Sequence, residues 1–141
     1  MKGIDVSSYQ EVIDWKKVKS NGVSFAILKI IRKDLTIDKQ FLSNSTGCNL
    51  NNIPFSVYNY TYALTRGKAK IDANAVVDVI KKNNIDKMKS FKKEIWMDVE
   101  HETQHGLGHT LIDIVKEYQN VIESNGYKFG VYTGLSFYNT E

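Results

Sequence analysis

The sequence predicts an α/β domain in which five strands alternate with four helices, the order that produces parallel βαβ units in a β/α barrel or an open parallel sheet. Two observations lead to this prediction. Short runs rich in β-branched and aromatic residues alternate with longer stretches whose apolar residues recur at helical spacing. Glycine or asparagine follows most of the helical stretches, as is common at helix C-termini. A chain of 141 residues has the length of one domain.

The expected elements follow one another without an internal repeat or linker. Asp14 is placed to cap the first helix, which Gly22 ends, and Gly47 is expected to end the second helix. In order, we expect a strand over residues 2–6, a helix over 15–21, a strand over 23–31, a helix over 37–46, a strand over 55–62, a helix over 68–83, a strand over 94–100, a helix from 111 that ends at Asn125-Gly126, and a strand over 128–133.

Composition excludes several classes of function. The net charge is only +3 and the lysines are dispersed, so the sequence does not indicate nucleic-acid binding. No stretch approaches the roughly 20 apolar residues that span a bilayer, and no basic segment followed by an apolar run begins the chain, so we expect neither a membrane span nor a signal peptide. The single cysteine, Cys48, forms no intrachain disulfide and is expected in the core.

The expected strand over residues 94–100 carries two carboxylates. Because successive side chains of a strand point to opposite faces, Trp96, Asp98 and Glu100 share one face. The Cβ atoms of Asp98 and Glu100 are about 6.5 Å apart, and their flexible side chains can bring the carboxyl groups closer together or farther apart. That spacing suits both retaining glycosidases, with carboxyl groups about 5–5.5 Å apart, and inverting ones, at about 6.5–9.5 Å. The apolar ring of Trp96 favours the protonated form of a neighbouring acid, as a general acid requires. Such a pair on its own equally suits a solvated strand end.

Other polar residues are expected near the same ends of the strands, where parallel α/β folds bind ligands. Asp5 supplies a third acid, and three acids with several tyrosines favour a site for a polar sugar ring. The tyrosines equally suit a buried strand, and the lysine equally suits a solvated rim. The additional candidates at these ends are Lys29, Tyr58, Tyr60 and Tyr132.

A second motif offers another chemistry. Residues 101–105 read His-Glu-Thr-Gln-His and match the zinc-peptidase pattern, in which both histidines lie on one face of a continuous helix. Here Gly106 and Gly108 interrupt that helix, and Leu111 occupies the position of the third histidine of metzincins. We therefore expect no metal and no other cofactor, and keep a zinc metallopeptidase through His101 and His105 as the alternative enzyme.

The motifs together resemble the Chalaropsis-type lysozymes, glycoside hydrolase family 25. The resemblance lies in Gly3-Ile4-Asp5-Val6, the Asp14-Trp15 pair, Met97-Asp98-Val99-Glu100 and Gly130-Val131-Tyr132-Thr133. It implies a β/α (TIM-like) barrel that hydrolyses the β-1,4 bond between N-acetylmuramic acid and N-acetylglucosamine in bacterial cell-wall peptidoglycan, without a cofactor.

The same resemblance implies roles for individual residues. Glu100 matches the proton donor, and Asp98 matches the acid that attacks the anomeric carbon or steadies the attacking 2-acetamido group of the substrate. Asp5 matches the acid of the first strand. Many members are phage or prophage endolysins that a holin or lysis releases to the wall. Lys29, Tyr58, Tyr60 and Tyr132 match positions that line the sugar groove, although Ile30-Ile31-Arg32 after Lys29 departs from the usual pattern.

The length of the chain departs from the family most. Residues 1–141 hold about the first five βα units of a single catalytic domain, whereas a β/α barrel typically needs about 250 residues. We therefore expect a C-terminally truncated chain that lacks the last barrel strands and any wall-binding module. An open edge at the fifth strand would favour self-association. A non-catalytic fragment that only binds wall glycan is the third alternative.

Overall fold

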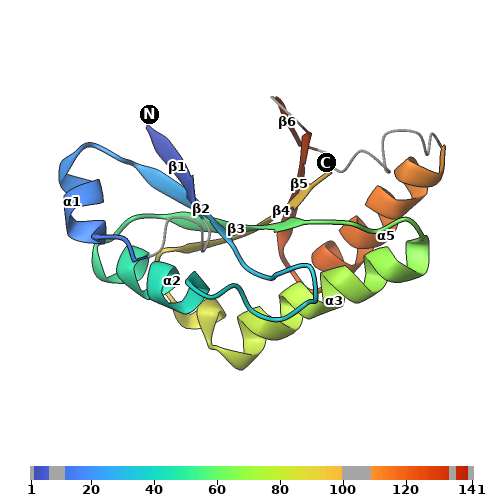
Figure 1. Cartoon of the computed structure of the whole chain (residues 1–141), viewed down its shortest axis with the longest axis horizontal. Helices are drawn as coiled ribbons and strands as arrows, with labels where there is room; N and C mark the ends of the chain where they lie inside the picture. Colours follow the sequence, from blue (N-terminus) through green and yellow to red (C-terminus); the bar gives the residue numbers. More distant parts are fainter. Residues whose placement is uncertain (1, 7–11, 100–108, 134–135, 140–141) are drawn as a thin grey trace.

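In the part of the chain that the structure describes, six strands form one sheet with helices packed on one side (Figure 1). The computed structural model describes residues 2–6, 12–99, 109–133 and 136–139. The strands lie in the order β1-β2-β3-β4-β5-β6; the first five pair in parallel, and β6 pairs antiparallel with β5. The elements are β1 (Gly3–Val6), α1 (Trp15–Ser20), β2 (Phe25–Lys29), α2 (Phe41–Leu50), β3 (Phe55–Tyr60), α3 (Arg66–Lys82), the 3₁₀ turn η2 (Ile85–Lys87), β4 (Phe91–Asp98), α5 (His109–Ser124), β5 (Lys128–Thr133) and β6 (Ser136–Asn139).

The core lies between the sheet and helices α2, α3 and α5, which cover the same side of it (Figure 1). Alternate strand residues such as Leu28, Val57 and Met97 point into this layer and are fully buried. Helix α5 has the strongly amphipathic pattern that the sequence predicted, and its buried positions include Ile114. The predicted α/β order of parallel βαβ units is confirmed.

The first helix begins where the sequence indicated. Asp14 is its N-cap, and the Asp14 side chain accepts a hydrogen bond of 3.2 Å from the backbone N–H of Lys17. The prediction for Cys48 is also correct. This residue is fully buried, and burial raises the pKa of its thiol from 9.0 to about 12.

The predicted bounds of the second helix are wrong. Helix α2 begins four residues later, because Ile31 and Ile37 form an antiparallel bridge that keeps the intervening segment in a turn. Gly47 lies inside α2 and does not end it. A Cβ atom at Gly47 would lie 2.1 Å from Cδ1 of Trp15, so this glycine permits close packing of α1 on α2.

Two strands also differ from the prediction. Strand β4 begins at Phe91 and not at Glu94. The strand continues through Lys92 and Lys93, where its pairing with β3 is irregular and Lys93 has a φ of 56°. The prediction that the fifth strand is an open edge is wrong, since β6 pairs with β5 through Gly130↔Asn139 to Thr133↔Ser136. None of the helices in the described ranges is long and apolar enough to cross a membrane.

Candidate functional site

The candidate site lies on the side of the sheet opposite α2, α3 and α5. In a parallel sheet, residues paired across adjacent strands point to the same side. The register pairs Tyr60 with Asp98 and Asp98 with Tyr132, so these three side chains form one row across the carboxyl ends of β3, β4 and β5. Asp98 is 7% exposed and both tyrosines are half-buried. The structure thus brings a buried carboxylate between two aromatic side chains.

A second row lies two residues earlier along the strands, on the same side of the sheet. Lys29 pairs with Tyr58, and Tyr58 pairs with Trp96. All three side chains are half-buried. The predicted groove residues Lys29, Tyr58, Tyr60 and Tyr132 therefore occupy two neighbouring rows with Asp98.

Asp5 lies on the same side of the sheet but apart from this group. It pairs with Ile27, two residues before Lys29, and its side chain is exposed. Strands β2 and β3 separate β1 from β4, which corresponds to about 14 Å measured along the sheet between Asp5 and the strand of Asp98. The structure therefore places Asp5 on the expected face without bringing it next to Asp98.

Trp96 is held by a contact that the sequence reasoning missed. Its Nε1–H donates a hydrogen bond of 2.7 Å to Oε1 of Glu94, and the same oxygen accepts a bond of 2.9 Å from the Ser56 hydroxyl. The ring lies against Gly130, where a Cβ atom would approach Cζ3 of Trp96 to 2.4 Å. The signal for Glu94 was its position two residues before Trp96 on the same strand, which places both on one face.

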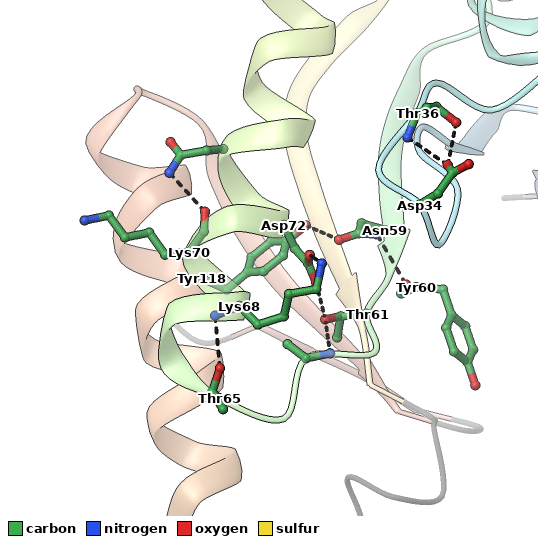
Figure 2. Close-up of polar contacts among 12 residues, drawn as sticks. Asp34, Thr36, Asn59, Tyr60, Thr61, Thr65, Lys68, Lys70, Asp72 and Tyr118 are labelled. Atoms are coloured by element: carbon green, nitrogen blue, oxygen red, sulfur yellow. Dashed lines mark hydrogen bonds and ion pairs between the residues drawn. The ribbon is translucent and has the colours of Figure 1, made fainter.

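A further aromatic pair extends the site beyond β3. The ring centroids of Tyr60 and Tyr62 are 5.0 Å apart, and Nζ of Lys33 lies 4.6 Å from the centroid of Tyr62, within the range of a cation–π interaction. The turn that carries Lys33 is closed by hydrogen bonds from Thr36 to Asp34, which lower the pKa of the Asp34 carboxyl (Figure 2). Lys33 was not among the predicted site residues.

The backbone of Asp98 is fixed on both sides. Its carbonyl accepts a hydrogen bond of 3.0 Å from the N–H of Thr61, and the N–H of the next residue, Val99, donates 2.9 Å to the carbonyl of Tyr132. The carboxylate therefore projects from a strand end that is bonded to both neighbours.

Two parts of the predicted site lie outside the residues that the structure describes. They are Glu100, the predicted proton donor, and the histidine motif at residues 101–105. Within the described ranges, no group of three or more His, Cys, Asp or Glu side chains is placed to hold a metal ion. The metallopeptidase alternative thus stays a prediction.

Comparison with known proteins identifies the family. The family model described as "Glycosyl hydrolases family 25" matches residues 4–141, nearly the whole chain. The chain belongs to glycosyl hydrolase family 25. The resemblance predicted from the motifs is thereby confirmed. A search of curated proteins found no match.

Solved structures agree with the family 25 assignment. The modular autolysin LytC of Streptococcus pneumoniae superposes with a TM-score of 0.78 at 28% identity, over 93% of this chain and 32% of LytC. The catalytic domain of endolysin ply40, from a bacteriophage of Listeria monocytogenes, gives 0.75 at 21% identity, over 94% of this chain and 62% of that one. The Streptomyces coelicolor lysozyme gives 0.73 at 23% identity, over 93% and 61%. This family 25 chain thus has their fold and spans about a third of LytC and three fifths of the other two.

Proposed function

We propose that this family 25 chain is a peptidoglycan hydrolase that cleaves the β-1,4 bond between N-acetylmuramic acid and N-acetylglucosamine. The observation that carries the proposal is the buried carboxylate of Asp98 between Tyr60 and Tyr132, on the side of the sheet that α2, α3 and α5 leave uncovered. LytC, which is 28% identical, has been solved in complex with a synthetic peptidoglycan ligand. That complex supports wall glycan as the substrate.

The proposed mechanism divides the acid chemistry between two carboxyl groups. Glu100, two residues after Asp98 in the sequence, donates a proton to the oxygen of the leaving sugar. Asp98 attacks the anomeric carbon or stabilises the 2-acetamido group of the substrate as that group attacks. The carboxylate of Asp98, which is 7% exposed, would stabilise the positive charge that develops on the sugar ring. Asp5, on β1, is the third acid of the proposed site.

The groove residues would hold the sugar rings. Half-buried tyrosines offer an apolar face to the sugar and a hydroxyl for hydrogen bonding. The row Lys29–Tyr58–Trp96 crosses β2, β3 and β4, and the row Tyr60–Asp98–Tyr132 crosses β3, β4 and β5. A glycan strand that crosses the sheet would contact the residues of a row one after another. No step of this mechanism requires a metal or organic cofactor.

Digestion of purified peptidoglycan tests the proposal. We expect reducing muramic acid ends from the unmodified chain, and a loss of at least about 100-fold with Glu100→Gln or Asp98→Asn, because each removes a group that acts in the transition state. Asp78→Asn, an exposed carboxylate on α3, is the matched control and should retain activity.

The identity of the products separates the alternatives. New peptide amines that disappear with EDTA would replace the proposal by the zinc metallopeptidase of His101 and His105. Retention of the chain on wall glycan without any product would replace it by a non-catalytic glycan-binding fragment. Reducing N-acetylglucosamine ends would place the cleavage at the other glycosidic bond of the strand.

Two further predictions concern the cellular setting and the assembly. We propose that the chain reaches the wall after release by a holin or by lysis. We also propose self-association through a sheet edge, although the edge expected for it at β5 is occupied by β6.

A further inference from the structure

A cluster of buried polar side chains lies behind the carboxyl end of β3, on the helix side of the sheet (Figure 2). Its members are Asn59, Thr61 and Asp72, which are 2%, 0% and 3% exposed. Asn59 and Thr61 flank Tyr60, whose side chain points to the opposite, open side. Two members of the cluster thus lie on either side of Tyr60, the residue of β3 that pairs with Asp98.

One arm of the cluster joins β3 to helix α3. The Thr61 hydroxyl donates a hydrogen bond of 3.0 Å to Oδ2 of Asp72, and it accepts one of 3.1 Å from the N–H of Ala63. The other carboxylate oxygen of Asp72 forms an ion pair of 2.9 Å with Nζ of Lys68, one turn earlier on α3. Thr61 is therefore held from the helix layer and from its own turn.

The second arm joins β3 to helix α5. The hydroxyl of Tyr118 donates a hydrogen bond of 3.0 Å to Oδ1 of Asn59, and the Asn59 amide donates 3.3 Å to the carbonyl of Tyr60 (Figure 2). Burial, together with the charge of Asp72, raises the pKa of Tyr118 well above its usual value, so the phenol stays a donor at neutral pH. Both helices therefore hold the segment Asn59–Thr61.

The held segment bonds directly to the candidate catalytic strand. The N–H of Thr61 donates 3.0 Å to the carbonyl of Asp98. Burying a carboxylate such as Asp72 is costly, and apolar side chains of similar volume often stabilise a core as well or better. The buried carboxylate of Asp72 is linked to the backbone of Asp98 through a single residue, Thr61.

We propose that Asp72 and Thr61 are positioning residues, which set the height and direction of the Asp98 carboxylate through the Thr61–Asp98 backbone bond. This role rests on the proposed function of Asp98. A catalytic group needs to be held within about 0.5 Å of its productive geometry, and misplacement by about 1 Å lowers rates about 100-fold. Neither residue touches the substrate, so the chain without the Thr61 hydroxyl should bind glycan normally and turn it over slowly.

Paired substitutions at Thr61 test the role. Thr61→Val keeps the shape and removes the hydroxyl, whereas Thr61→Ser keeps the hydroxyl. We expect kcat on peptidoglycan fragments to fall about tenfold or more in the valine variant, with KM within about twofold, and the serine variant to retain kcat within about threefold. Equal losses in both variants, or a change confined to KM, would overturn the proposal. If Thr61→Val does not fold, Thr61→Ala removes the same hydroxyl and takes its place.

A control and a second measurement separate this role from general stability and from the proposed function. Tyr127→Phe removes another partly buried hydrogen bond, 2.7 Å to Asp86, at the opposite end of the sheet, and should leave kcat unchanged. Amide exchange in Thr61→Val should accelerate about tenfold at residues 61 and 99, with the amides of β1 and β2 within about twofold of the unmodified chain. Uniform acceleration would refute the positioning role. If the unmodified chain cleaves no glycan, the proposed function fails, and the exchange rates still decide the role.

Discussion

Replacing Gly130 by alanine tests how the floor of the candidate site is packed. The added Cβ would lie 2.4, 2.5 and 2.8 Å from three ring atoms of Trp96, so the ring must move by about 1 Å to restore ordinary contacts. Overpacking of this kind costs about 1–3 kcal/mol. If the moved ring loses its 2.7 Å bond to Glu94, about 1–3 kcal/mol more is lost. Alanine regains about 0.5–1 kcal/mol through its lower backbone entropy in the unfolded chain, so the middle of each range gives an expected net loss of about 3 kcal/mol.

Urea unfolding followed by circular dichroism measures this loss, provided that the m value is unchanged. The substitution is made in the parent chain and in a Trp96→Leu background, where the smaller side chain removes the clash. We expect Gly130→Ala to cost less than about 1 kcal/mol in that background, which gives a coupling energy of about 1–3 kcal/mol. Gly67→Ala, at a helix position with open space around the new Cβ, is the matched control and should not destabilise. An equal cost of Gly130→Ala in both backgrounds would refute the packing of Trp96 on Gly130.

Two further predictions concern the helix layer. Helix propensity alone predicts that Gly47→Ala stabilises α2 by about 1 kcal/mol, whereas overpacking against Trp15, 2.1 Å away, costs about 1–3 kcal/mol and predicts a net loss of up to about 2 kcal/mol, so the sign of the change in urea unfolding decides between them. Because the pKa of Cys48 rises from 9.0 in the unfolded chain to about 12 in the fold, its stabilising effect is complete below pH 9 and is lost as the pH rises towards 12. Relative to Cys48→Ala, the unfolding free energy should therefore fall by about 1.4 kcal/mol more between pH 8 and 10, and parallel declines in the two chains would contradict this burial effect.

Local signals predicted the order of elements because each is readable within a few residues. Asp14 caps α1 through a bond to a residue only three positions away, and the alternation of Ile95, Trp96 and Met97 needs no knowledge of neighbouring strands. The same alternation correctly placed Asp98 on the side away from the core. These features depend on backbone geometry and side-chain type alone.

Features that depend on distant residues were not predictable in the same way. Gly47 has the sequence context of a helix end, and only the ring of Trp15, which belongs to another helix, shows that it is needed for close packing. Likewise, Lys92 and Lys93 read as a charged boundary, although β4 continues through them because β3 accepts an irregular pairing there. Long-range packing can override local propensity in both cases.

The buried cluster at Asp72 illustrates why a site needs support from both sides of a sheet. Strands β3 and β4 end at Tyr60 and Asp98, and among the described residues the bonds from Thr61 to Asp98 and from Val99 to Tyr132 are the last rungs of the ladder. Terminal rungs open most readily, because loss of one bond there exposes no further core. A carboxylate at such a rung is accessible to substrate, but its backbone hydrogen bonds are among those that open most readily. The hydrogen bonds that fix Thr61 from the helix layer oppose that opening without occupying the open side, where a substrate would have to bind.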